Sequence, residues 1–87
     1  MNDFDLLQSA NAVRAKISDE ARGRLEYYRE LYRKAAEDGD ELAQATAYGQ
    51  IKGYTDALAG FKVITDSERP LLNLYYIDGC KEDNDNV

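Results

Sequence analysis

The sequence predicts an all-α protein organised around an antiparallel helical hairpin. Apolar residues recur at helical spacing on both sides of the segment Glu37–Asp40, which holds the clearest turn signal of the chain. Gly39 can adopt the left-handed conformation that ends a helix, and Asp40 can accept a backbone hydrogen bond at the start of the next one. Because the connection is only about three residues long, the two flanking helices should fold back against each other.

The N-terminal segment predicts a helix that begins near Phe4, with Asp3 as its cap. Ser18, followed by two acidic residues, is a typical helix start. The apolar phase continues across Ser18, so two interpretations stay open: one long helix over residues 4–37, or a short helix followed by a longer one. The start signal and the presence of Gly23 favour two helices. The apolar positions of the first helix are Leu6, Ala10, Val13 and Ile17.

Residues Asp40–Ile64 predict one helix with two apolar faces, a large face of bulky side chains and a small face of glycine and alanine. Glycine is less favourable than alanine by about 1 kcal/mol inside a helix, so three glycines predict that another group approaches this face closely. Two interpretations stay open: packing within the hairpin, with Tyr27, Tyr28 or Tyr32 filling the groove, or packing against a second subunit. The large face comprises Ala47, Ile51, Tyr54, Leu58 and Phe61, and the small face Ala45, Gly49, Gly53, Ala57 and Gly60.

The C-terminal part of the chain predicts a short element that docks on the rest. Ser67 can cap a helix that has Pro70 in its first turn, where the missing N–H of proline is harmless. The segment Leu71–Ile77 is too apolar to stay in solvent, and it is interpreted as a short helix, with a strand as the less favoured alternative. Residues 1–79 thus form a single helical domain, and residues 80–87 are predicted to be a disordered acidic tail.

The composition excludes several classes of function. The 87 residues contain no histidine and one cysteine, Cys80, so the usual zinc ligand sets cannot form within one chain. No catalytic motif or phosphate-binding loop is present, and the chain is predicted to have no enzymatic activity, no cofactor and no metal. The net charge of −6 argues against direct nucleic-acid binding. A single cysteine, no signal peptide and no long apolar stretch predict a cytoplasmic protein.

These observations predict a non-enzymatic protein–protein interaction or regulatory module that self-associates through helix packing, most simply as a homodimer. One alternative is a small acidic inhibitor that presents carboxylates to the basic surface of a nucleic-acid-binding enzyme. Another is an oligomer whose tyrosines and arginines hold a small anionic ligand between subunits. In size, acidity and hairpin layout the chain is similar to small helical proteins of bacteriophages and mobile elements, and no residue role is carried over from that likeness. The predicted self-association residues are Ala47, Gly49, Ile51, Gly53, Tyr54, Ala57, Leu58, Phe61, Leu71, Leu74 and Tyr75, and the predicted acidic partner surface is Glu37, Asp38, Asp40 and Glu41.

Overall fold

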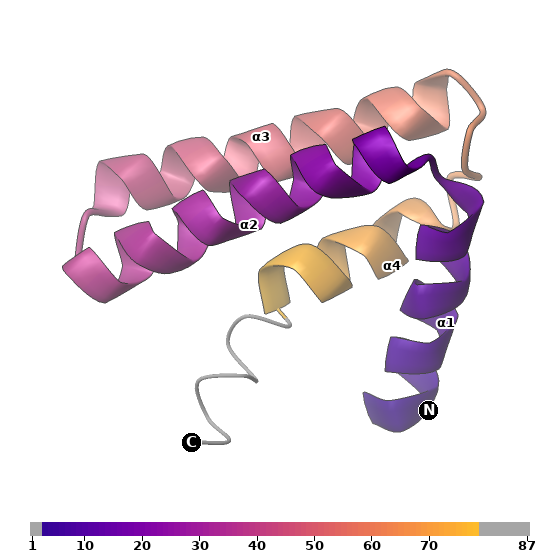
Figure 1. Ribbon diagram of the computed structural model, residues 1–87, viewed down its shortest axis with the longest axis horizontal. Coiled ribbons are helices and arrows are strands. Elements are labelled where there is room, and N and C mark those ends of the chain that lie inside the picture. The colour runs from indigo at the N-terminus through magenta and orange to yellow at the C-terminus, as the bar shows by residue number, and fades with distance from the viewer. Residues whose placement is uncertain (1–2, 79–87) are drawn as a thin grey trace.

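A computed structural model describes residues 3–78 of the chain, and every element in this range is helical (Figure 1). The elements are α1 (Asp3–Lys16), α2 (Asp19–Asp38), α3 (Glu41–Gly60), α4 (Arg69–Asn73) and a π-helical turn, η1 (Leu74–Asp78), that continues α4. The predicted all-α class is confirmed, and the C-terminal segment is a helix rather than a strand. The predicted tail, residues 80–87, lies outside the described residues.

Helices α2 and α3 form the predicted antiparallel hairpin, with α4 along one side of it and α1 descending steeply from one end (Figure 1). Gly39 has a φ of 71°, the left-handed conformation expected at a helix end. The N–H groups of Gly39 and Asp40 donate to the carbonyls of Ala36 and Ala35, at 3.3 and 2.9 Å. The Asp40 carboxylate accepts from the N–H of Ala43 at 3.0 Å, so it caps α3 as predicted.

The chain breaks between α1 and α2 at Ser18, which confirms the two-helix interpretation. The Ser18 hydroxyl oxygen accepts from the N–H of Ala21 at 3.1 Å and caps α2. The guanidinium of Arg22 donates to the carbonyls of Arg14 and Ile17, at 2.7 and 2.9 Å. The Arg14 carbonyl also accepts from the N–H of Ile17 at 3.3 Å. Carbonyls at a helix end lack the full set of helical partners, so Arg22 stabilises the corner at which the two helices meet.

The hydrophobic core lies where α4 and η1 pack against the hairpin and against the C-terminal end of α1. The one buried polar side chain in the described range, Thr55, donates to the side-chain oxygen of Asn73 at 2.7 Å, which joins α3 to α4. The bond removes the penalty of burying an unpaired hydroxyl. The most deeply buried large side chains are Leu25, Ile51, Leu72 and Tyr76.

Helix α3 is shorter than predicted, since it ends at Gly60 and does not continue to Ile64. The chain turns through Lys62, which has a φ of 62°, and Ile64 returns to the core with 2% of its surface exposed. At about 3.6 residues per turn, a helix that continued to Ile64 would point this side chain in the same direction as Gly53. That direction is opposite to the core. Burial of Ile64 therefore requires the helix to end first, which a count of apolar spacing alone does not reveal.

The predicted cap at Ser67 is also wrong, because no side chain caps α4 directly. Its N-cap residue is Glu68, and Thr65 instead caps the turn that leads into the helix. The Thr65 hydroxyl accepts from the N–H of Glu68 at 3.2 Å, and the Glu68 carboxylate accepts from the N–H of Thr65 at 2.8 Å. This reciprocal pair is a capping box, in which Thr and Glu are three residues apart. Glu68 also binds the ammonium of Lys16 at 2.7 Å, so the start of the C-terminal segment is attached to α1. Pro70 lies in the first turn of α4, as predicted.

Candidate interaction surface

The large face of α3 is used inside the chain, where it closes the hairpin. Ala47 and Ile51 are buried in the core, with 2% and 0% of their surface exposed. Tyr54 and Leu58 are half-buried against the same core, and the Tyr54 ring meets the Tyr28 ring of α2 edge-on, with centroids 6.2 Å apart. These four predicted self-association residues therefore have partners within one chain. The fifth member of the face, Phe61, lies outside the helix and is 83% exposed.

The small face of α3 is open, so the interpretation that packing within the hairpin covers it is wrong. A Cβ atom added to Gly49, Gly53 or Gly60 would meet no neighbouring atom within 4 Å. None of the three tyrosines proposed to fill this groove does so. Tyr32 is buried in the core, Tyr28 packs on Tyr54, and Tyr27 is 55% exposed.

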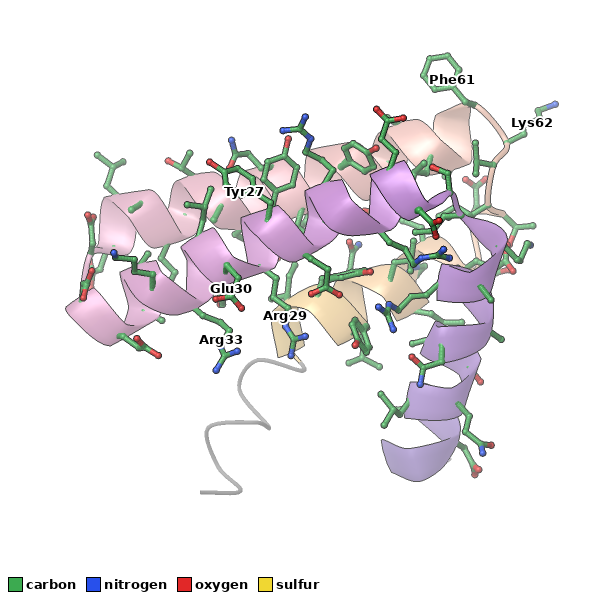
Figure 2. All side chains as sticks on the ribbon, in the orientation of Figure 1. Tyr27, Arg29, Glu30, Arg33, Phe61 and Lys62 are labelled. Carbon is green, nitrogen blue, oxygen red and sulfur yellow. The ribbon has the colours of Figure 1, made fainter. Side chains whose placement is uncertain are left out.

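The exposed side of α3 forms a surface, here called the outer face, that consists mainly of small residues. The exposed carboxylate of Asp56, three residues after Gly53 and four before Gly60, lies at its margin. Its most exposed member is Leu42, which is 80% exposed. Leu42 lies near the N-terminal end of α3, whereas Phe61 follows the C-terminal end. Figure 2 shows Phe61 projecting away from the hairpin. Sequence reasoning missed Leu42, although its three-residue spacing from Ala45 places it on this side of a helix. The outer face comprises Leu42, Ala45, Thr46, Gly49, Gly53, Ala57 and Gly60, all of them exposed.

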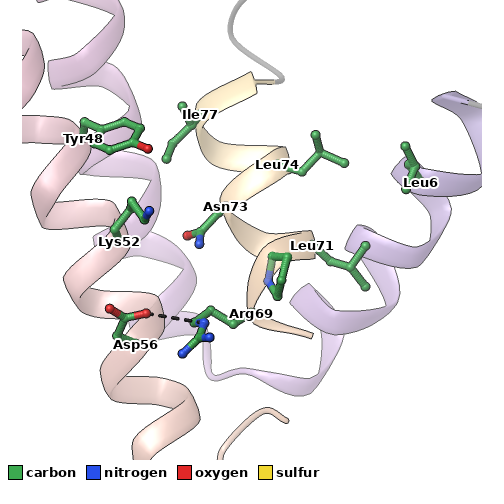
Figure 3. Close-up of a pocket in the computed structure, with 10 residues that line it drawn as sticks. Leu6, Tyr48, Lys52, Asp56, Arg69, Leu71, Asn73, Leu74 and Ile77 are labelled. Carbon is green, nitrogen blue, oxygen red and sulfur yellow. Dashed lines mark ion pairs between the residues drawn. The ribbon is translucent and has the colours of Figure 1, made fainter. Parts of the chain in front are cut away.

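Two charged residues in the middle of α3, Lys52 and Asp56, line a groove between α1, α3 and α4 that borders the outer face (Figure 3). This groove has a volume of about 690 Å³. Asp56 pairs with Arg69 across it, at 3.5 Å. Leu71 and Leu74 are half-buried and point toward α1 on its other wall. These two predicted self-association residues thus face α1, on a different side of the molecule from the outer face.

Tyr75 is held by a cluster of charged groups that joins α1, α2 and η1. The guanidinium of Arg14 lies 4.3 Å from the centre of the Tyr75 ring, and that of Arg29 lies 5.3 Å from it. Both arginines are paired with Glu26, at 3.2 and 3.9 Å. Cations over an aromatic ring are attracted by its negative face. Tyr75, predicted to take part in self-association, is therefore engaged within the chain.

The same cluster shifts the pKa values of two of its members. Burial raises the pKa of the Tyr76 hydroxyl, against the hydrogen bond from Arg14, which acts to lower it. Burial acts to lower the pKa of Arg14, but the bond to Tyr76 and the neighbouring Glu26 raise it above its ordinary value. Arg14 therefore stays charged and Tyr76 stays neutral, which is the arrangement that a stable structural contact needs.

The four residues of the predicted acidic partner surface lie together at the turn of the hairpin, and all of them are exposed. Glu37 and Asp38 are the last two residues of α2. Asp40 caps α3, and Glu41 is the first residue of that helix. Their contact with a basic partner stays a prediction. The four are Glu37, Asp38, Asp40 and Glu41.

Within residues 3–78 no three histidine, cysteine, aspartate or glutamate side chains are grouped so that they could hold a metal ion. No helix in this range is long and apolar enough to cross a membrane. Comparison of the chain with protein-family models, with curated proteins and with solved structures finds no match, so the functional argument rests on the residues of this chain.

Proposed function

We propose that the protein is a non-enzymatic interaction module that self-associates through helix packing on the outer face of α3. The observation that carries this proposal is the empty space over Gly49, Gly53 and Gly60. Each of these glycines is less favourable than alanine by about 1 kcal/mol in a helix interior. Nothing within residues 3–78 packs on them, so the fold of this part of the chain does not account for their presence.

A helix–helix interface accounts for them directly. Glycine allows the backbone of a second helix to approach closely, because it has no Cβ atom. The outer face offers such an approach along most of α3, which at 20 residues is about 30 Å long. The exposed Leu42 and Phe61 add apolar area at its two ends. Because the patch lies mainly on one helix, it falls at the small end of stable interfaces, and we expect a dissociation constant in the micromolar range.

Analytical ultracentrifugation over a range of protein concentrations tests the proposal. The wild type should convert from monomer to dimer as the concentration rises through the micromolar range. Gly53→Leu should remain a monomer, because a leucine side chain would fill the space that a second helix needs. Gly23→Leu is the matched control. Gly23 is an exposed helical glycine of α2 that also has no neighbour within 4 Å, and its replacement should leave association unchanged.

Helix content separates a packing effect from misfolding. Both substitutions replace an exposed helical glycine with a better helix former, so the monomers should be as helical as the wild type or more so. A wild type that stays monomeric up to the millimolar range would contradict the proposal. Equal association of the Gly53→Leu and wild-type proteins would show that another surface is used.

A further inference from the structure

We infer that the outer face of α3 binds a second copy of this chain, with the two α3 helices antiparallel about a two-fold axis at the level of Ile51. The inference rests on the proposed function and adds the orientation of the two copies and the residues that meet. Three observations carry it: the order of the small residues, the positions of the exposed large apolar residues, and the charges at the two ends of α3.

The small residues of the outer face read the same in both directions. Ala45, Gly49, Gly53 and Ala57 follow one another at intervals of four residues, with the level of Ile51 at their midpoint. A two-fold axis at this level places Gly49 of one copy opposite Gly53 of the other, and Ala45 opposite Ala57. A surface that maps onto itself in this way suits an isologous contact between identical chains.

The row also has the geometry of a common helix crossing. Residues four apart form ridges on a helix, and two such rows pack at an angle of about 50°. The two backbones then come closest at the centre of the crossing, where Gly49 and Gly53 lie. At about 3.6 residues per turn, this centre points directly away from the buried Ile51, so neither hairpin obstructs the other.

The large apolar residues of this region stand at the ends of α3. Leu42 and Phe61 are 80% and 83% exposed, the highest fractions among the exposed large apolar residues described. In an antiparallel pair, the Leu42 end of one copy meets the Gly60–Phe61 end of the other. A leucine then faces a glycine and an aromatic ring, which shields apolar surface that a single chain leaves in water.

Charge favours the same orientation. The end of α3 that carries Leu42 also carries Asp40 and Glu41, next to Glu37 and Asp38, whereas Lys62 projects from the turn at the other end (Figure 2). Antiparallel pairing brings this ammonium toward the acidic end of the partner copy. Parallel pairing would bring the two acidic ends together, and juxtaposed like charges are unfavourable in an interface.

Disulfide cross-linking between two single-cysteine variants tests the orientation. Ala45→Cys and Ala57→Cys are each made in a full-length chain that also carries Cys80→Ser, mixed in equal amounts and oxidised gently. Antiparallel pairing predicts a cross-linked dimer that contains one chain of each kind. It should form about tenfold faster than cross-links in either variant alone, because identical positions would be separated by about 18 Å along the helix axes, beyond the reach of a disulfide.

The outcomes separate the orientation from the proposed function. Fast cross-linking of Ala45→Cys with itself would show parallel pairing and overturn the inference. Dimerisation in the ultracentrifuge with no cross-link in any combination would overturn it as well, because another surface would then be in use. In both cases the self-association module would stand. A wild type that never dimerises would overturn both proposals.

Reversal of charge gives an independent test of the same arrangement. Lys62→Glu and Glu41→Lys should each weaken dimerisation by about two- to five-fold at low salt, as expected for exposed ion pairs. A mixture of the two variants should form a heterodimer more tightly than either variant forms a homodimer. Equal affinity of all three combinations would contradict the antiparallel contact.

Discussion

Arg14 of α1 donates a hydrogen bond of 3.0 Å to the phenol oxygen of Tyr76, 62 residues later in the chain. The same guanidinium reaches Asn11 and Glu26, at 3.1 and 3.2 Å, so the Tyr76 hydroxyl completes a set of partners from three elements. Tyr76 is fully buried. Its hydroxyl therefore joins the beginning and the end of the described chain at the edge of the core.

Tyr76→Phe should lower the free energy of unfolding by about 1–2 kcal/mol, because it removes a buried hydrogen bond to a charged group. The corresponding fall in the melting temperature is about 4–16 °C for a domain of this size. Tyr75→Phe is the matched control, since it keeps the ring on which Arg14 and Arg29 lie. Chemical denaturation of both variants makes the comparison. Equal losses of stability would contradict a specific role for the Tyr76 hydroxyl.

Acid should weaken the attachment of the C-terminal segment to α1. Hydrogen bonds from Lys16 and from the Thr65 backbone hold the pKa of Glu68 below its usual value of 4.5. A lowered pKa in the folded state means that the contribution to stability is complete above pH 4.5 and is lost as the pH falls through the folded value. Urea denaturation between pH 7 and pH 3 should therefore show a smaller loss of stability for Glu68→Gln than for the wild type.

Glu37→Gln is the control for this pH experiment, because it removes a carboxylate at the far end of the hairpin and leaves the Lys16–Glu68 contact intact. Its pH profile should follow that of the wild type. Identical profiles for Glu68→Gln and the wild type would show that Glu68 does not couple acid to stability.

Replacement of Thr65 and of Ser67 should have unequal effects. Thr65→Ala removes the hydroxyl that accepts from the N–H of Glu68 and should reduce stability by about 0.5–2 kcal/mol, as for other helix caps. Ser67→Ala removes only a contact with Thr65 and should change stability by less than about 0.5 kcal/mol. Thermal denaturation of both variants ranks them. A larger effect at Ser67 would restore it as the cap.

Two exposed glycines should respond to alanine in opposite directions. Gly39 has a positive φ, so Gly39→Ala should reduce stability by about 1–2 kcal/mol, although there is room for a methyl group. Gly23 lies within α2 and has equal room, so Gly23→Ala should raise stability by up to about 1 kcal/mol. Denaturant titration measures the free energy of unfolding of each variant. A low protein concentration keeps the chains monomeric, so self-association does not contribute to the difference. Changes of the same sign would contradict this assignment of the turn.

Local chemistry made the hairpin and the break at Ser18 predictable. Gly39 acts through its own left-handed conformation. The side chains of Asp40 and Ser18 each accept a hydrogen bond from the N–H three residues later, that of Ala43 and that of Ala21. Such signals depend on a few adjacent residues. The cap at the C-terminal segment was harder to assign because Thr65 and Ser67 carry equivalent hydroxyl groups, and only Thr65 has a glutamate three residues later.

Helical spacing separated the two faces of α3 but could not say which neighbour each one has. The pattern that contains Ala47 and Ile51 predicts burial equally well against α2 or against another chain. The assignment of Phe61 to this face depended on a helix that continued to Ile64, and the turn after Gly60 separates it from the others. The Arg14–Tyr75 contact could not be predicted either, because no local pattern connects residues so far apart in sequence.

The long separation between Arg14 and Tyr76 also implies an order of assembly. The entropy lost on closing a loop grows with its length, so the contacts on either side of Gly39 form at the least entropic cost. The hairpin of α2 and α3 should therefore be present in the folding transition state, with α1 and η1 docking afterwards. Substitutions at Gly39 should then alter the folding rate, and substitutions at Tyr76 should alter the unfolding rate. Because the unfolding rate sets the lifetime of the native state, that lifetime depends on the contacts between the two ends of the described chain.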